Sequence, residues 1–168
     1  MFIHHEKIEI QSDRRPTFDN ITDTVKQTIR KTNFLNGTVL VYSPHTTCSV
    51  LIQEASDGQN YWGTEYILQD LVNVLQKIIP TCTSEGQYLH PCQKHIELAA
   101  ELRDELPSWS LNTDAHLRSV MLGRSVTIPV IDGELMLGEF GNIYFADFDQ
   151  VRARKRTAII QLMGNCAE

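Results

Sequence analysis

Residues 38–53 read TVLVYSPHTTCSVLIQ, which is two apolar runs separated by a short polar turn. The first run, residues 38–43, is rich in β-branched side chains and predicts a strand. The second run, residues 48–53, predicts another strand, and the turn between them begins with a proline that restrains its backbone. His45 therefore directly follows a strand that looks buried, a position where loop side chains often take part in function. From the residues alone, a functional histidine and a hydrogen-bonded turn histidine stay equally open.

The rest of the chain mixes strand and helix patterns without a regular repeat. Further strands are predicted at residues 2–10, 125–131, 134–137, 142–148 and 157–163. Helices are predicted at residues 21–31, 62–79, around 98–106 and 114–122. Asp132-Gly133 is a hairpin turn, and the basic residues 149–156 are expected to join the last two strands as a hairpin. The mixture predicts an α+β fold: one compact domain with a mixed, largely antiparallel sheet and flanking helices.

Composition narrows the class of protein. The 168 residues hold 15 Lys and Arg against 21 Asp and Glu, a net charge of −6, which argues against non-specific nucleic-acid binding. No apolar run approaches the ~18 residues of a membrane span, and the N-terminus does not resemble a signal peptide. The four cysteines form no C-x-x-C pair and are expected to be free thiols. We therefore expect a cytoplasmic protein that binds neither membranes nor nucleic acid.

Three of the six histidines stand in loops or at a helix start, namely His45, His90 and His116. Neutral imidazole is the commonest metal ligand, and three protein ligands with one open position are typical of catalytic zinc. The sequence separations do not show whether these rings meet, and inert, partly buried histidines are the more frequent case. His95 is interpreted as a surface residue.

Three acidic residues are candidates for catalysis, for orienting a ligand or for helix capping. Glu54 and Asp57 follow the strand 48–53 and are candidate general bases, partners that orient a metal-bound histidine, or helix caps. Asp114 has the same ambiguity, with capping of the helix 114–122 favoured.

Two basic segments are candidate anion sites. The turn Gly123-Arg124-Ser125 combines a glycine, a guanidinium and a hydroxyl, which can hold a phosphate, although a helix C-cap followed by a strand is the commoner meaning. The run from Arg152 to Arg156 is interpreted as a solvated turn that protects the sheet edge, with an anion site or subunit contact as the less common alternative.

Several segments together resemble one protein family. They are PHTTCSVLIQE at residues 44–54, Tyr88-Leu89-His90, Ala115-His116-Leu117, LGRSVTIP at residues 122–129 and DGELMLG at residues 132–138. They are similar to motifs of the YjbQ-like proteins, whose members are often described as secondary thiamine-phosphate synthases. The resemblance covers nearly the whole chain in the same order.

The resemblance implies a homotrimer whose shared histidines hold a divalent metal ion, with zinc favoured and magnesium possible. The implied ligands are His45, His90 and His116, and the implied catalytic residues are His45, Glu54, Asp57 and His116. Such an enzyme joins a pyrimidine pyrophosphate to a thiazole phosphate. We expect contacts to a small phosphorylated substrate from Thr46, Thr47, Asp114, Arg118, Gly123, Arg124 and Ser125. The alternatives are another phosphate chemistry, or a non-catalytic trimer that binds a metal or small anion.

The chain departs from the family pattern at four places, one of which is Glu139-Phe140-Gly141 where the family has tryptophan-glutamine. Asp114 stands where many members have a histidine, and Ser56 stands where an asparagine is frequent. The segment from Cys92 to Asn112 matches no motif of the family.

Overall fold

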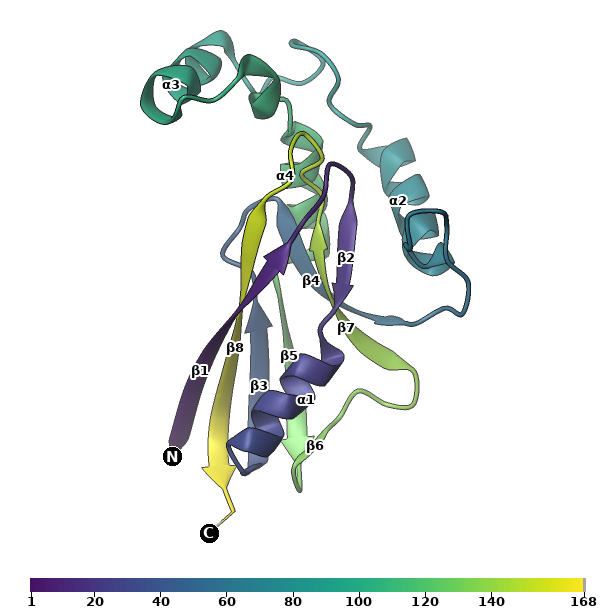
Figure 1. Cartoon of the computed structure of the whole chain (residues 1–168), viewed down its shortest axis with the longest axis vertical. Helices are drawn as coiled ribbons and strands as arrows, with labels where there is room; N and C mark the ends of the chain where they lie inside the picture. Colours follow the sequence, from purple (N-terminus) through teal and green to yellow (C-terminus); the bar gives the residue numbers. More distant parts are fainter. Residues whose placement is uncertain (168) are drawn as a thin grey trace.

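The computed structural model describes residues 1–167, which form two antiparallel sheets and four α-helices in one α+β unit (Figure 1). The five-stranded sheet has the order β1-β8-β3-β5-β6, and the three-stranded sheet has the order β2-β7-β4. The strands are β1 (Phe2–Gln11), β2 (Thr17–Asn20), β3 (Phe34–Tyr42), β4 (Cys48–Glu54), β5 (Ser125–Ile131), β6 (Glu134–Leu135), β7 (Gly141–Asp147) and β8 (Lys155–Cys166). The helices are α1 (Thr22–Lys31), α2 (Tyr66–Ile78), α3 (Gln93–Arg103) and α4 (Thr113–Leu122), with a short 3-10 helix, η1 (Pro107–Ser110).

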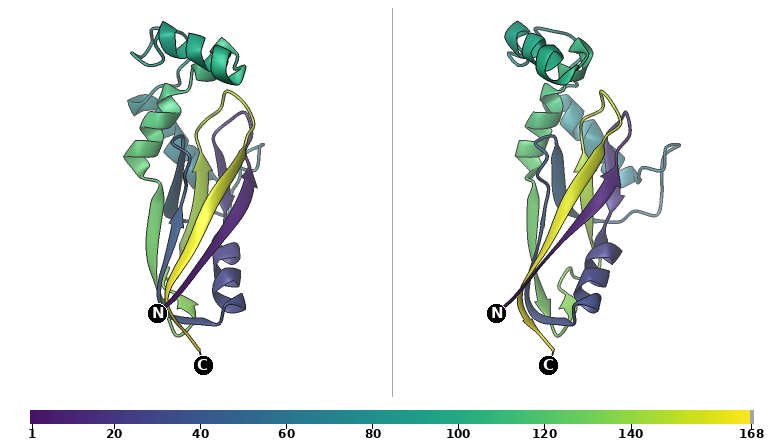
Figure 2. Two further views of the ribbon diagram at one scale, coloured as in Figure 1. Left: turned by 90° about the vertical axis from the view of Figure 1, so that its left-hand side faces the viewer. Right: turned by 60° about the vertical axis from the view of Figure 1, so that its left-hand side comes forward.

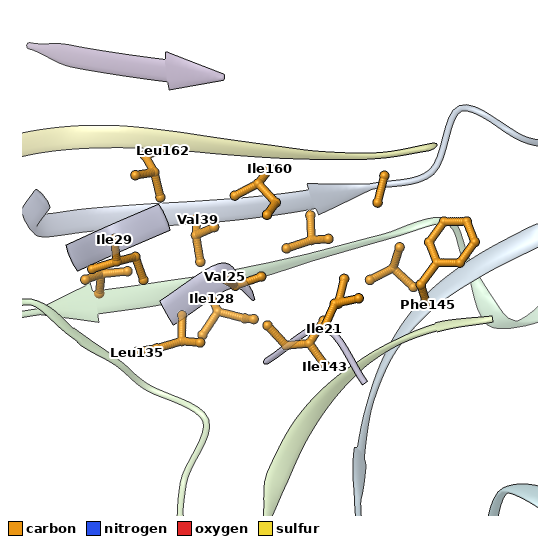
Figure 3. Packing of buried hydrophobic residues seen from close by; sticks show 14 of the residues in the cluster. Ile21, Val25, Ile29, Val39, Ile128, Leu135, Ile143, Phe145, Ile160 and Leu162 are labelled. Atoms are coloured by element: carbon orange, nitrogen blue, oxygen red, sulfur yellow. The ribbon is translucent and has the colours of Figure 1, made fainter. Parts of the chain in front are cut away.

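The two sheets share one apolar core. Val39 of β3 and Ile160 of β8 pack with Ile143 and Phe145 of β7, and all four are almost fully buried. The stripe of α1 that includes Val25 covers the same core, as Figure 3 shows. Because side chains alternate along a strand, the two faces of β7 serve two different clusters of buried side chains.

The other face of β7 meets the helices. Ala146 packs with Phe148, with Leu75 of α2 and with Ala115 of α4 in a smaller second cluster. Beyond this layer, α3 and η1 stand past the end of the sheets, near the connection between β7 and β8 (Figure 2). No helix within residues 1–167 is long and apolar enough to cross a membrane.

The predicted α+β class with antiparallel sheets is confirmed, but the expected terminal hairpin is wrong. β7 pairs with β2 and β4, whereas β8 pairs with β1 and β3, so residues 148–154 cross from one sheet to the other. The patterns of both strands are apolar along their lengths, and that property alone does not specify the partner strand.

Two element boundaries also differ from the prediction. β3 begins at Phe34 and contains Gly37, which pairs with Gly164 of the neighbouring strand β8. A Cβ on either glycine would press on the backbone of the facing strand, so the close approach explains Gly37 better than a helix stop does. α2 begins only at Tyr66, because the Asn60 side chain accepts hydrogen bonds from the backbone of the preceding turn.

Candidate functional site

An open cavity of about 420 Å³ lies where the turn after β3, the start of α4, the α3–η1 segment and the β7–β8 connection meet. We call it the histidine pocket. Its lining includes Pro44, His45, Thr46, Thr47, His95, Arg103, Glu105, Trp109, Ser110, Asn112, His116, Asp149, Arg154 and Arg156. Four elements distant in sequence thus deliver imidazoles, guanidiniums and hydroxyls to one volume.

His45 is held in a defined tautomer. Its Nε2 accepts a hydrogen bond of 2.9 Å from the backbone N–H of Thr157 on β8. A backbone N–H can only donate, so Nε2 is unprotonated and the neutral ring carries its proton on Nδ1. Burial lowers the pKa of His45, and the nearby charge of Arg156 lowers it further. His45 is therefore set up as a hydrogen-bond donor, and its Nε2 lone pair is already occupied.

His90 has the opposite arrangement. The Thr113 hydroxyl donates to the backbone carbonyl of His90, so it can only accept from the ring, and His90 Nδ1 lies 2.9 Å from that oxygen. The proton therefore sits on Nδ1, and the Nε2 lone pair has no partner within residues 1–167. Burial lowers the pKa of His90, and the neighbouring rings of His95 and His116 lower it further.

His95 and His116 gather around His90. The ring centroids of His90 and His95 are 4.7 Å apart, and those of His90 and His116 are 5.9 Å apart. Burial lowers the pKa of His116, while the charge of Asp149 and the Thr46 backbone act in the opposite sense. His95, interpreted from the sequence as a surface residue, is half-buried and lines the pocket. Only the folding of the segment before α4 brings it here, and no motif in the sequence signals that.

The predicted ligand set of His45, His90 and His116 is not assembled around one point in this structure. Among residues 1–167, no group of three or more His, Cys, Asp or Glu side chains is arranged to hold a metal ion. The hydrogen bond from Thr157 explains part of this, because it removes His45 Nε2 from the available donors.

Glu54 and Asp57 lie away from the pocket. Glu54 pairs with Gly141 at the far end of β4, and both acids are exposed. A strand of seven residues spans about 23 Å, so β4 separates them from His45 within one chain. The carboxylates that do line the pocket are Glu105 and Asp149, which the sequence did not single out, and Asp149 lies 3.2 Å from Arg154.

The basic run 152–156 is not a solvated turn. Arg156 is buried and donates to both carboxylate oxygens of Asp147, at 2.6 and 3.1 Å, and to the Thr47 hydroxyl at 3.0 Å. Burial alone would lower the pKa of Arg156, but its hydrogen bonds to Asp147 and the charge of Asp147 raise it. The run forms part of the pocket wall because two carboxylates on β7 and just after it draw its guanidiniums inward.

Asp114 and Arg118 support a loop and do not line the pocket. The Arg118 guanidinium is fully buried, donates to the Ile79 carbonyl and lies 3.4 Å from Asp114. Asp114 also accepts the Cys82 backbone N–H. The predicted capping role of Asp114 is wrong, because α4 has Asn112 as its N-cap, with no side-chain capping bond. Direct substrate contact by Arg118 would require the loop after α2 to rearrange.

The Gly123-Arg124-Ser125 turn also lies outside the pocket lining. Gly123 has φ +85° and ends α4, and Ser125 begins β5. This geometry matches the commoner alternative, a C-cap followed by a strand. Of the expected substrate-binding residues, Thr46 and Thr47 line the pocket together with the histidines.

Comparisons with known proteins agree with this architecture. A model of the protein family described as UPF0047 protein YjbQ-like matches residues 6–165. A UPF0047 protein of Archaeoglobus fulgidus is 32% identical over 149 residues, 89% of this chain and 94% of that protein. The UPF0047 protein YugU of Bacillus subtilis is 28% identical over 157 residues, 94% of this chain and 97% of that protein.

Solved structures share the fold. The crystal structure of a YjbQ/UPF0047 family protein from Clostridium acetobutylicum has a TM-score of 0.71 and 25% identity, and covers 94% of this chain and 99% of that one. A YbjQ-like protein of unknown function from Sulfolobus solfataricus has a TM-score of 0.73 at 21% identity, and covers 98% and 99%. At that identity the likeness concerns the fold alone.

We predict that Arg156→Gln destabilises the protein by about 3–5 kcal/mol, because it leaves the buried Asp147 carboxylate without its charged partner. The matched control is Lys155→Gln at the exposed neighbouring position, expected to change stability by less than about 0.5 kcal/mol. Urea unfolding of the two variants measures the difference. Equal stabilities would show that the ion pair contributes little.

We also predict that the His45 ring titrates below its ordinary pKa of 6.5 in the folded protein. The unfolded chain then takes up its proton first as the pH falls. His45 therefore contributes a loss of stability that begins near pH 6.5 and grows toward the lower folded pKa. NMR titration of the ring, with the urea-unfolded chain as reference, measures both pKa values. A folded value at or above the unfolded one would contradict the assigned tautomer.

Proposed function

The chain belongs to the YjbQ-like UPF0047 family, and we propose that its histidine pocket binds a small phosphorylated substrate through the phosphoryl oxygens. The observation that carries this proposal is the set of donors on one wall. His45 offers Nδ1–H, and Thr46 and Thr47 line the same cavity. Phosphate oxygens accept only, so a wall of neutral donors with a nearby guanidinium suits them.

The local charge supports a small anion. Four arginines surround the pocket, while the nearby carboxylates Glu105, Asp147 and Asp149 neutralise most of their charge. The net charge of the chain is −6, and these arginines are gathered around one cavity. A compact phosphorylated molecule fits such a cavity, whereas a nucleic acid needs an extended basic surface. We place the protein in the cytoplasm, where its free thiols stay reduced.

The reaction that we propose is the one implied by the family resemblance, formation of thiamine phosphate. The thiazole nitrogen attacks the methylene carbon of the pyrimidine pyrophosphate, and the C–O bond breaks with its electron pair leaving on pyrophosphate. Charge then grows on the leaving pyrophosphate, where preorganised donors contribute most to rate. We assign that role to His45 and Thr46, which both line the pocket.

A divalent metal is the second part of the proposal. His90 presents an unprotonated Nε2, and the rings of His95 and His116 are its neighbours. We propose that these three histidines, with His95 in place of His45, hold the ion after small rotations of the rings. Three imidazoles favour zinc over magnesium, which prefers oxygen ligands. A bound zinc ion would add positive charge beside the pyrophosphate.

A homotrimer is the third part of the proposal. α4 exposes Leu117, Val120 and Met121, an apolar stripe at helical spacing beside His116. Exposed apolar patches of this kind mark protein interfaces, and a cyclic assembly would cover the stripe on every subunit. The neighbouring subunit would also be able to supply Glu54 and Asp57, the carboxylates that β4 keeps away from the pocket of its own chain.

To test the phosphate site, inorganic phosphate is titrated into the wild-type protein and into His45→Ala by calorimetry, with His5→Ala on β1 as the control. We expect wild-type dissociation constants between micromolar and millimolar, and at least tenfold weaker binding in His45→Ala only. Circular dichroism confirms that each variant is folded at the temperature used. Equal binding by all three proteins would refute the site.

The reaction has its own readout in the same proteins. Pyrimidine pyrophosphate and thiazole phosphate are mixed with zinc-loaded protein, and released pyrophosphate is measured. Product formed by wild type and lost in His45→Ala supports the reaction. Phosphate binding without product would replace this reaction by another phosphate chemistry and leave the binding site standing.

For the assembly, sedimentation of wild type is expected to give three times the chain mass of 19.2 kDa. Val120→Glu places a charge in the stripe on α4, and we expect it to sediment as a monomer. Val74→Glu, on the exposed face of α2, is the control and should stay trimeric. A monomeric wild-type protein at micromolar concentration would end the trimer proposal.

A further inference from the structure

Two hydrogen-bonding groups at the outer wall of the pocket lack partners within residues 1–167. They are the hydroxyl of Ser110, a residue only 3% exposed, and Nε of Arg154. Both residues line the histidine pocket. Burying such groups without a partner forfeits their bonds to water, so almost all buried polar groups in proteins are paired. The pairing partner expected here is a bound ligand.

The position of Ser110 is fixed by an ionic clamp. Ser110 ends η1, and the Glu105 carboxylate just before η1 accepts a hydrogen bond of 2.6 Å from Arg152 and lies 3.5 Å from Arg103. The Arg152 guanidinium also stacks over the Trp109 ring, with its carbon 4.1 Å from the ring centroid. This clamp ties the α3–η1 segment, which stands beyond the sheets in Figure 2, to the β7–β8 connection. The unpartnered hydroxyl is therefore held in place and does not belong to a loose loop.

The chemistry of these groups restricts the ligand. Nε–H of Arg154 can only donate, and a serine hydroxyl donates readily, so both call for an acceptor oxygen. Arg103 lines the same side of the cavity and adds positive charge. The group that suits this wall is an oxyanion, either a phosphate or a carboxylate.

The pocket is large enough to hold this oxyanion beside the phosphoryl group already assigned to His45. The cavity of about 420 Å³ has room for roughly fourteen water molecules at ~30 Å³ each. One phosphate group of five heavy atoms fills only part of that space. Ser110 also comes from a different element than His45, because it ends η1 whereas His45 lies in the turn after β3.

We propose that Ser110 and Arg154 bind a second oxyanion group of the substrate, so that the pocket selects molecules carrying two such groups. The inference rests on the proposed function, because it presumes that the first group is a phosphate held near His45. It assigns substrate selection to the segment from Cys92 to Asn112, for which the family motifs gave no role.

The test compares three probes by calorimetry: inorganic phosphate with one oxyanion group, pyrophosphate with two phosphates, and 2-phosphoglycolate with a phosphate and a carboxylate. Wild type should bind at least one of the two larger probes about tenfold more tightly than phosphate. The stronger of the two identifies the second group. Ser110→Ala should weaken the larger probes by about threefold to tenfold and leave inorganic phosphate unchanged. Ser108→Ala, at an exposed serine of the same η1, is the matched control.

Thermal unfolding of the ligand-free variants separates a binding role from a structural one. Removing a hydroxyl that has no partner should leave the midpoint of Ser110→Ala unchanged or raise it. A clearly lowered midpoint would show that the hydroxyl is bonded within the protein and would overturn the inference.

The outcomes distinguish this inference from the proposed function. If inorganic phosphate binds in a His45-dependent way but Ser110→Ala keeps full affinity for the larger probes, only the second oxyanion site fails. If no probe binds to wild type, both proposals fail.

Discussion

The structure depends on one buried guanidinium. Arg156 lies at the start of β8 in the five-stranded sheet, and its partner Asp147 ends β7 in the three-stranded sheet. The ion pair is thus a bridge between the two sheets at the end where the pocket opens. A third bond, to the Thr47 hydroxyl, fixes the start of β4 in the same network. Because a buried charge without partners is so costly, the chain cannot separate these elements without losing much of its stability.

The same network sets the chemistry of the pocket. Thr157 follows Arg156 directly, and its backbone N–H holds Nε2 of His45. The bridge between the sheets therefore also determines which nitrogen of His45 carries the proton. Burial and the charge of Arg156 lower the pKa of His45 and keep the ring neutral near pH 7. A neutral donor beside a guanidinium attracts an anion without requiring protonation.

Local patterns in the sequence were sufficient for most of the strands and helices, including α4 with Gly123 at its end and the strand pair around His45, but they missed the short strand β2. These patterns failed where contacts between distant segments determine the structure. The hairpin expected for β7 and β8 was wrong, because each is an interior strand of a different sheet and pairs on both sides with strands distant in sequence. The arginines after β7 were interpreted as solvated because charge runs usually are, and the buried carboxylates that bind them cannot be recognised from spacing. His95 and Ser110 had no signal, since the segment that carries them is positioned by tertiary contacts such as those of Glu105, Arg152 and Trp109.

The histidines that the sequence predicts as one set of metal ligands differ in which ring nitrogen is left free by their hydrogen bonds. Thr157 occupies the lone pair of His45 and leaves an N–H, whereas Thr113 occupies the N–H of His90 and leaves a lone pair. An anion is bound by the first kind of ring and a cation by the second, so a single trio of equivalent ligands is inconsistent with this geometry. His116 lines the same pocket as His45, and its ring also neighbours His90. A phosphorylated substrate placed between the two kinds of ring would contact donors on one side and a metal on the other, and that polarity orients the molecule before any bond breaks.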